Sequence, residues 1–186
     1  MKKIILASDS PRRKELLQQA GIEFDVVASN YEEKLDTRNF DYKSIEDTAY
    51  NKALCVSKKI NEKAVIIGAD TVVVLNNLVL TKPKTRSEAI DMLKALSCTE
   101  HKVVTSICII DSYSGEVKIK SDTTLVRFKN LDDEKITNYV DTYKPYDKAG
   151  AYGIQELPEG FVDYINGNIE NVIGLCTETV KMMLND

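Results

Sequence analysis

Two hydroxyl side chains and two guanidinium groups stand close together near the start of the sequence. Ser8 and Ser10 precede Pro11, and Arg12 and Arg13 follow it. Serine as N-cap and proline at the first helical position predict that a helix begins here, so the arginines would lie near its N-terminus, where the helix dipole favours anions. A bound phosphate would satisfy the free N–H groups, the hydroxyls and the guanidiniums together. The residues alone leave open a second interpretation, a solvated basic turn whose arginines pair with acidic neighbours.

A carboxylate interrupts the most apolar segment of the chain. Asp70 follows Gly68-Ala69 within residues 64–75, and β-branched residues lie on both sides. Burial of a carboxylate is costly unless a cation or hydrogen bonds meet it, so Asp70 is a candidate metal ligand or general base. The Gly-Ala-Asp sequence also predicts a break, giving strand, kink and strand. The structural alternative is an Asx turn, in which Asp70 caps its own backbone.

Three further features could contribute to a binding site. Lys52 falls within the apolar stripe of a predicted helix, so its stem packs on the core while its ammonium either reaches solvent or meets an anion. Lys82 lies at the end of a predicted strand, directly before Pro83. The segment 146–155 contains two glycines and two alanines among polar residues, a composition that lets the backbone approach a ligand closely.

The elements that must position these residues alternate between strand and helix early in the chain. A short buried strand precedes the first helix, which is expected to end at Gly21. Paired strands follow in the middle of the chain, with a hairpin turn at Asn76-Asn77. This order predicts an α/β fold with a mixed sheet. The expected strands are 4–7, 24–27, 78–80, 102–110, 117–128 and 161–165, and the expected helices are 11–20, 44–59, 85–96, 132–143 and 177–184.

Composition limits the classes of protein to be considered. The 186 residues are 43% hydrophobic, which is enough for one domain with a substantial core. A net charge of −4 argues against a general nucleic-acid binder, which would need a broadly basic surface. The four cysteines form no CxxC pair, and His101 is the only histidine, so neither a zinc site nor a disulfide framework is indicated. Neither a signal peptide nor a membrane span is predicted, so a cytoplasmic protein is expected.

The whole sequence resembles the Maf family of nucleoside triphosphate pyrophosphatases. The resemblance depends on seven motifs in family order and at family spacing. They are L-A-S-D-S-P-R-R-K-E-L-L at 6–17, E-E-K at 32–34, N-K-A at 51–53, G-A-D-T-V-V at 68–73, K-P at 82–83, D-K-A-G-A-Y-G-I-Q at 147–155 and N-V-I-G-L at 171–175. The motif at 147–155 resembles the branch that acts on dTTP and UTP, rather than the branch that prefers a methylated guanine nucleotide.

The resemblance implies a fold, a reaction and a set of residues. The fold would be α/β, with a long, mixed, twisted sheet and helices forming two lobes of a single domain, residues 1–186, around a central cleft. The reaction would be hydrolysis of a nucleoside triphosphate between the α and β phosphates with a divalent cation, Mg²⁺ or Mn²⁺, and homodimers are typical of the family. Asp70 matches the proton acceptor, and Arg13, Thr71 and Gln155 match positions tied to substrate selection. The matching polar positions that line the family's cleft are Ser8, Arg12, Glu33, Lys52 and Lys82.

The chemistry of a triphosphate fits these residue types. The cationic side chains would hold the polyphosphate, Glu33 and Asp70 would bind the metal, and the amide of Gln155 would contact a pyrimidine edge. Two other functions compete: a pyrophosphatase that acts on inosine, xanthosine or methylated-guanine triphosphates, and a nucleotide-binding regulator of cell division that acts without turnover.

The sequence departs from the family at four positions. Thr81, Cys98 and Glu156 stand where glycine is usual and would store strain if those positions need positive φ. Cys176 replaces the proline that usually starts the last helix.

Overall fold

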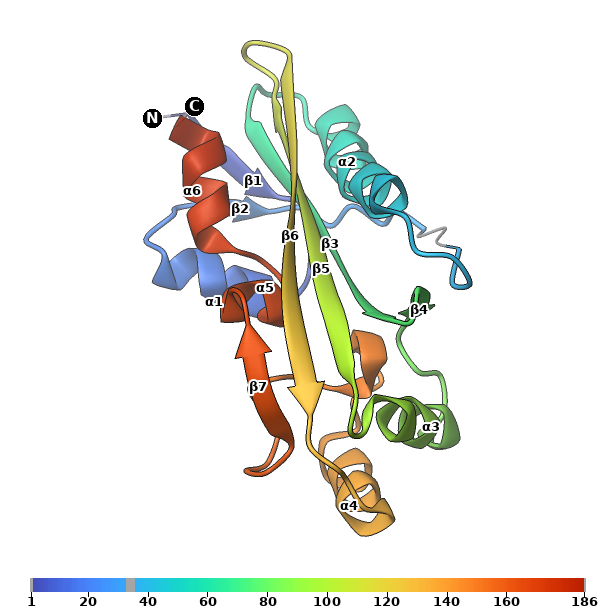
Figure 1. Cartoon of the computed structure of the whole chain (residues 1–186). Coiled ribbons are helices and arrows are strands. Elements are labelled where there is room, and N and C mark those ends of the chain that lie inside the picture. Colours follow the sequence, from blue (N-terminus) through green and yellow to red (C-terminus); the bar gives the residue numbers. More distant parts are fainter. Residues whose placement is uncertain (1, 33–35, 186) are drawn as a thin grey trace.

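The computed structural model describes residues 2–32 and 36–185, and its centre is a seven-stranded mixed sheet (Figure 1). The strand order is β2-β1-β3-β5-β6-β7, and β4 pairs with β3. The strands are β1 (Ile4–Leu6), β2 (Asp25–Val26), β3 (Val65–Leu75), β4 (Leu78–Leu80), β5 (Glu100–Asp111), β6 (Glu116–Phe128) and β7 (Val162–Asn166). The helices are α1 (Pro11–Gln19), α2 (Tyr42–Lys59), α3 (Arg86–Leu96), α4 (Asp133–Tyr143), the 3₁₀ helix η1 (Ala149–Ala151), α5 (Ile169–Ile173) and α6 (Thr177–Asn185).

The sheet combines parallel and antiparallel pairing. Strand β1 runs parallel to both β2 and β3, whereas β3, β5, β6 and β7 pair antiparallel in that order. The pairing of β3 with β5 continues from Val65 to Val74, and the pairing of β5 with β6 covers both strands along nearly their whole lengths. The predicted long mixed sheet is therefore confirmed.

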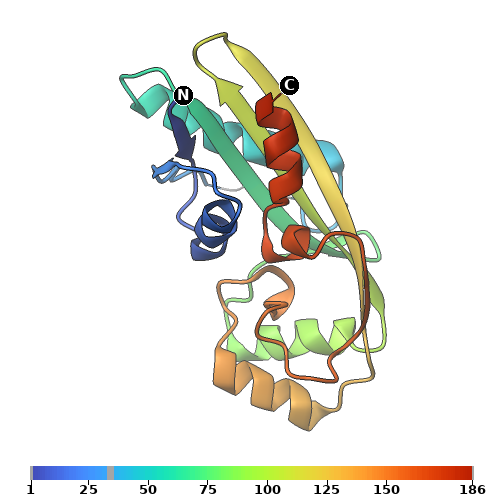
Figure 2. The ribbon, with the colours of Figure 1, turned by 90° about the vertical axis from the view of Figure 1, so that its left-hand side faces the viewer.

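The two faces of β3 are covered by different helices. Its even-numbered positions face α2, where Ile66 packs with Ala49, Ala53 and Val56. Its odd-numbered positions face α1 and α6, where Ile67 packs with residues that include Leu17. Further along the strand, Val73 belongs to a core that includes α3 and α4. Figures 1 and 2 show α1, α5 and α6 on one side of the sheet, α2 on the other, and α3 and α4 together at the far end.

The strand-kink-strand prediction for residues 64–75 is wrong, because β3 is one continuous strand through Gly68, Ala69 and Asp70. Gly68 allows a helix to pack closely on the strand and does not mark a bend in it. A Cβ at this position would collide with the carbonyl oxygen of Ala49 and lie 2.8 Å from the amide nitrogen of Ala53. Helix α2 can therefore lie directly on β3 because residue 68 has no side chain.

One helix begins earlier than expected, and another was not expected. Helix α2 begins at Tyr42 rather than at Ser44, because the side chain of Asp41 accepts a hydrogen bond from the N–H of Lys43 and caps the helix earlier. The short helix α5, Ile169–Ile173, was not predicted. The remaining helix and strand expectations are met within a few residues at their ends.

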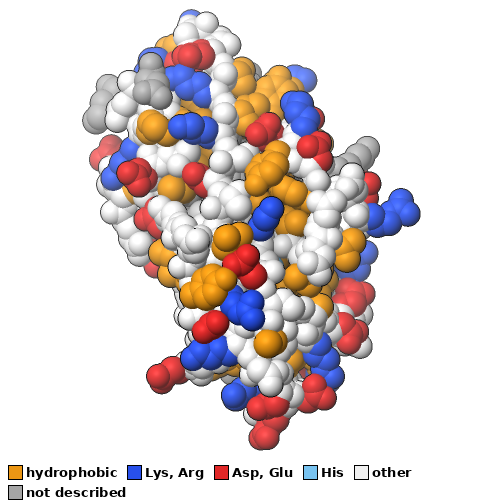
Figure 3. Space-filling model, viewed as in Figure 1, with side chains coloured by type: hydrophobic (Ala, Val, Ile, Leu, Met, Phe, Trp, Pro, Cys, Tyr) orange, Lys and Arg blue, Asp and Glu red, His pale blue; other side chains and the backbone are white. Residues whose placement is uncertain are grey.

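The surface carries charge of both signs. On the face shown in Figure 3, lysine and arginine side chains are interspersed with aspartate and glutamate, and the described residues of that face form no continuous basic area. None of the described helices combines the length and the hydropathy that crossing a bilayer requires.

Candidate active site

A cleft opens where one edge of β3 is left uncovered. On the edge away from β5, strand β1 pairs with residues 65–67 of β3, and β4 pairs with residues 73–75. Among the described residues, no strand pairs with the intervening segment 68–72 on this side. A cavity of about 440 Å³ lies here, and Asp70 and Thr71 form part of its wall. Side chains from both faces of the sheet can therefore reach the same space around the open edge.

The cleft brings together every described residue that the sequence proposed for the site. Residues from the β1–α1 loop, α1, α2, β3, the segment after β4 and the segment after η1 all line it. They are Ser8, Arg12, Arg13, Lys52, Asp70, Thr71, Lys82 and Gln155. Glu33 lies outside the described residues.

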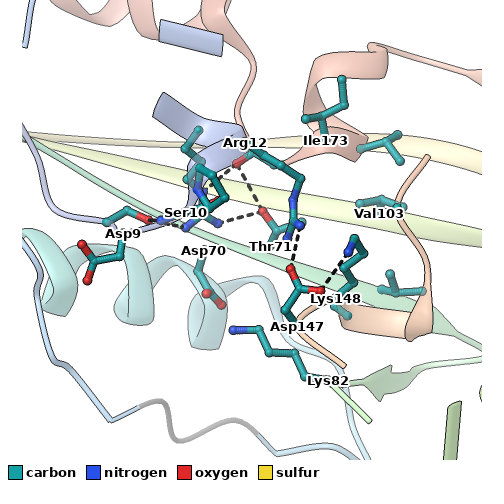
Figure 4. A pocket seen from close by; sticks show the side chains of 18 of the residues that line it. Asp9, Ser10, Arg12, Asp70, Thr71, Lys82, Val103, Asp147, Lys148 and Ile173 are labelled. Atoms are coloured by element: carbon teal, nitrogen blue, oxygen red, sulfur yellow. Dashed lines mark hydrogen bonds and ion pairs between the residues drawn. The ribbon is translucent and has the colours of Figure 1, made fainter. Parts of the chain in front are cut away.

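The innermost part of the cleft holds a buried ion pair. The ammonium of Lys52 donates to Oδ1 of Asp70 at 2.7 Å, and both side chains are less than 10% exposed. Lys52 therefore meets an anion and does not extend into solvent. Because Asp70 lies inside a continuous strand, the Asx-turn interpretation is wrong. Figure 4 shows the side chains of Asp70 and Lys82 directed toward the same part of the cavity.

Arg13 connects three separate parts of the chain. Its guanidinium donates to the carbonyl oxygen of Gly174 at 2.9 Å, to Oγ1 of Thr71 at 3.0 Å and to Oγ of Ser8 at 3.2 Å. Thr71 also shares a hydrogen bond of 2.9 Å with Thr105 on β5. The guanidinium is buried, so these contacts hold a positive charge in a defined position beside the cleft.

The N-terminus of α1 borders the cleft as predicted, although Ser10 does not cap it with its side chain. Ser10 occupies the N-cap position and Pro11 the first helical position, but the hydroxyl makes no capping hydrogen bond. Instead, the N–H of Ser10 donates to Oγ of Ser8 at 3.2 Å. The hydroxyl of Ser8 therefore accepts from both Ser10 and Arg13, which gives the turn a defined shape.

A second charged group lies at the rim of the cleft. Asp147 accepts hydrogen bonds from Arg12 at 2.9 Å and from Lys148 at 2.8 Å (Figure 4). Nζ of Lys148 also lies 3.2 Å from a carboxylate oxygen of Glu156. Partial burial opposes ionisation of Asp147, but the hydrogen bonds and charges of Lys148 and Arg12 outweigh it, so the pKa of this carboxyl lies below its usual value. In the sequence, Asp147 and Lys148 stand out only as part of the motif at 147–155. The sequence signal that could have marked them as binding residues is the pair of opposite charges directly before the small residues 149–151.

The opposite end of the cleft is mostly apolar. The residues here come from β3, β5, the segment after η1 and α5, and the exposed Gln155 also lines the cleft. The apolar members are Val73, Val103, Tyr152, Ile154, Val172 and Ile173. These residues could not be predicted from the sequence, because an apolar residue in a strand gives the same pattern whether it faces a core or a cavity.

The segment 149–155 is held in place from behind by two buried polar side chains. Nε2 of His101 and the hydroxyl of Tyr152 are 2.8 Å apart, and the N–H of Gly153 donates to the hydroxyl of Tyr139 at 3.1 Å. Desolvation lowers the pKa of His101 to about 4, so the imidazole is neutral near pH 7. Burial also raises the pKa of Tyr139 to about 12, so its hydroxyl keeps its proton. A neutral polar layer thus supports the part of the cleft that contains Gln155.

The four positions at which the sequence departs from the family pattern differ in their backbone conformation. Cys98 adopts a φ of 58°, so the expected strain is confirmed there. Thr81 and Glu156 are not among the residues with positive φ, so no strain of this kind arises at either. Cys176 directly precedes α6, which begins at Thr177 without a proline.

The donor set of the cleft suits a hard divalent cation that shares its coordination with a substrate. Asp9, Asp70 and Asp147 all line the cavity. No group of three or more metal-ligating side chains is present within the described part of the chain. Magnesium typically takes one or two protein carboxylates and completes its shell with phosphate oxygens and water. The carboxylates of the cleft therefore fit this mode of binding.

Comparisons with known proteins agree with the geometry. Residues 3–186 match the family model described as Maf-like protein. A dTTP/UTP pyrophosphatase of Clostridium perfringens is 47% identical over 93% of this chain and 91% of its own length. A dTTP/UTP pyrophosphatase of Thermoanaerobacter sp. is 46% identical over 93% of this chain and 90% of its own length.

A solved structure supports the fold. The HAM1 protein from Coxiella burnetii superposes with a TM-score of 0.53 at 15% identity, and the match covers 100% of this chain and 99% of that one. Similarity at this level establishes a shared architecture, while the sequence relatives and the family model establish kinship along nearly the entire length. The chain belongs to the Maf family.

Proposed function

We propose that this protein hydrolyses dTTP and UTP to the monophosphate and pyrophosphate. The observation that carries the proposal is the buried pair of Asp70 and Lys52 at the open edge of β3, in a cleft that also presents Arg12 and Lys82. A carboxylate surrounded by cations suits attack of water on a polyanionic phosphate chain. Relatives named dTTP/UTP pyrophosphatase, 43–47% identical over most of the chain, support this choice of substrate.

Asp70 orients and deprotonates the water that attacks the α phosphorus. The new P–O bond forms at the α phosphate, the bond to the bridging oxygen breaks, and the electron pair leaves with pyrophosphate. Lys52 fixes the carboxylate of Asp70 through the hydrogen bond of 2.7 Å and adds a positive charge beside it. Arg12 and Lys82 stabilise the negative charge that develops on the leaving pyrophosphate.

Asp70 and Glu33 are the proposed ligands of a divalent cation, Mg²⁺ or Mn²⁺. Such a cation, when bound, would neutralise phosphate charge and lower the pKa of a coordinated water. Arg13 and Ser8 hold the N-terminus of α1 next to the same space through their hydrogen bonds. That terminus therefore offers backbone N–H groups to the phosphates.

The nucleobase occupies the apolar end of the cleft. Val103 and Ile173 line this end, and the amide of Gln155 can both donate to and accept from a pyrimidine edge. Thr71 contributes by holding Arg13 in place between the two ends. We also propose, from the family resemblance, that residues 1–186 act as one two-lobed domain in a cytoplasmic homodimer. A link to cell-division arrest would be a consequence of this same nucleotide site.

The test measures pyrophosphate release from dTTP, UTP, CTP, GTP, ITP and 7-methyl-GTP, with Mg²⁺ or Mn²⁺. The Asp70→Asn variant should lose at least about 100-fold in kcat on dTTP and UTP, because the proton acceptor is removed. Asp141→Asn is the matched control, since Asp141 pairs with Arg86 on the surface outside the cleft. Preference for ITP or 7-methyl-GTP would overturn the assigned substrate, and turnover that survives in Asp70→Asn would overturn the assigned mechanism.

A further inference from the structure

The carboxylate of Asp147 occupies a position between two cations of the cleft. One oxygen accepts from Nη1 of Arg12 at 2.9 Å, and the other accepts from Nζ of Lys148 at 2.8 Å. Arg12 belongs to α1 and Asp147 to the segment before η1, so the pair bridges the cleft between two distant parts of the chain (Figure 4). The oxygens of a phosphate form the same kind of hydrogen bond to a guanidinium as those of a carboxylate.

The two partners of Asp147 differ in how firmly they are held. The side chain of Lys148 is 9% exposed, and Glu156 provides a second carboxylate at 3.2 Å. A Cβ at Gly153 would approach the Cε of Lys148 to 2.8 Å, so the lysine stem runs directly against the backbone of residue 153. Arg12 is 27% exposed and Asp147 is 59% exposed. Asp147 can therefore leave Arg12 and turn toward water, while Lys148 stays in place.

We propose that Asp147 is an internal competitor of the polyphosphate for Arg12. In the free protein the carboxylate of Asp147 accepts the hydrogen bond from Arg12 that an oxygen of the leaving pyrophosphate would otherwise accept. Binding of the substrate breaks the pair of Arg12 and Asp147, and the pair re-forms as pyrophosphate departs. Asp147 thus weakens the binding of both the substrate and pyrophosphate and speeds release of the product. The inference builds on the proposed function for the identity of the substrate, but it concerns polyphosphate binding in general.

The competition predicts that removing the charge of Asp147 tightens anion binding. Loss of a partly exposed Arg–carboxylate pair, together with loss of a charge that repels a nearby phosphate, should change the affinity by about fivefold. Asp147→Asn should lower the dissociation constant of inorganic pyrophosphate and of tripolyphosphate by about fivefold. The KM for dTTP should fall by a similar factor, while kcat should fall or stay constant because product release becomes slower.

The experiment combines titration calorimetry with steady-state kinetics, each with and without Mg²⁺. Asp141→Asn makes the same chemical change at a surface pair with Arg86 and should leave both polyphosphate affinity and KM unchanged. In an Arg12→Gln background, Asp147→Asn should have a clearly smaller effect, because the competition for Arg12 is then absent and only the repulsion between carboxylate and phosphate remains. Thermal unfolding of each variant verifies that the fold is retained, and Asp147→Ser replaces Asp147→Asn if the latter does not fold.

Two results would overturn the inference. Weaker or unchanged polyphosphate binding in Asp147→Asn would show that Asp147 does not compete for Arg12. If Asp147→Asn bound polyphosphate more weakly only in the presence of Mg²⁺, the carboxylate of Asp147 would instead be identified as a metal ligand. If the wild-type protein failed to hydrolyse dTTP, the proposed function would fall, yet calorimetry with tripolyphosphate would still decide the role of Asp147.

Discussion

His101 offers a direct test of the polar layer behind the cleft. It is the single histidine of the chain, it is 2% exposed, and its ring lies edge-on to Phe128 and Tyr152. Nε2 faces the hydroxyl of Tyr152, and no hydrogen-bond partner of Nδ1 is found among the described residues. A charged imidazolium in this position would be poorly solvated, which is why desolvation lowers the pKa to about 4.

The shift in pKa makes stability depend on pH. In the unfolded chain the imidazole titrates near its ordinary value of 6.5. Between about pH 6.5 and 4 the unfolded state therefore binds a proton that the folded state does not, and the free energy of unfolding falls as the pH falls. One pKa unit corresponds to about 1.4 kcal/mol, so the full loss from His101 is about 3 kcal/mol, reached near pH 4. Above about pH 6.5 the contribution is complete and constant.

The assay compares urea unfolding of the wild type and of His101→Gln at several pH values from 7.5 to 4. Carboxylates titrate in both proteins, so the difference between the two curves isolates the imidazole. We expect the wild type to lose about 3 kcal/mol more than the variant between pH 7 and pH 4. The imidazole resonances in an NMR titration give the folded pKa independently. Parallel stability curves, or an imidazole that titrates near pH 6.5 in the folded protein, would refute the reasoning.

Two further predictions concern backbone packing. Gly68→Ala should lower the free energy of unfolding by about 3 kcal/mol, because the added methyl meets backbone atoms of α2 that cannot move without shifting the helix; urea unfolding measures this, and a loss below about 1 kcal/mol would contradict the described packing of α2 on β3. Cys98→Gly should stabilise the protein by up to about 1 kcal/mol, because glycine adopts a φ of 58° without the strain that the Cβ of Cys98 causes there; a lower melting temperature in thermal unfolding would contradict it.

The architecture was predictable because its signals are local. The serine and proline that begin α1, the two asparagines between β3 and β4, and the alternation of apolar residues each act within a few positions. Asn76 and Asn77 indeed adopt φ values of 47° and 70°, which fit the tight turn that was expected. The prediction of a strand break at Gly68 was wrong for the converse reason. A glycine required by a helix packed against it has the same local signature as a glycine required by a bend.

The contacts between the residues of the site were less predictable than the identities of those residues. Spacing placed Lys52 in an apolar stripe and apolar flanks marked Asp70 as unusual, but neither pattern indicates that the two side chains meet. Arg12 and Asp147 are 135 residues apart, so only the folded chain shows that they form a pair. The polar residues named from the family motifs, where they are described, do line one cleft. The apolar residues at the other end of the cleft have no distinctive sequence pattern.

The uncovered edge of β3 explains why residues from both faces of the sheet share one cavity. Successive side chains of a strand point to opposite faces, so Asp70 meets Lys52 on the α2 face and Thr71 meets Arg13 on the α1 face. In a fully paired sheet the backbone would separate these two groups. Because β1 ends at Leu6 and β4 pairs only from Val73, both groups border the same opening. Extending β1 across this gap would therefore divide the site even if every side chain were retained.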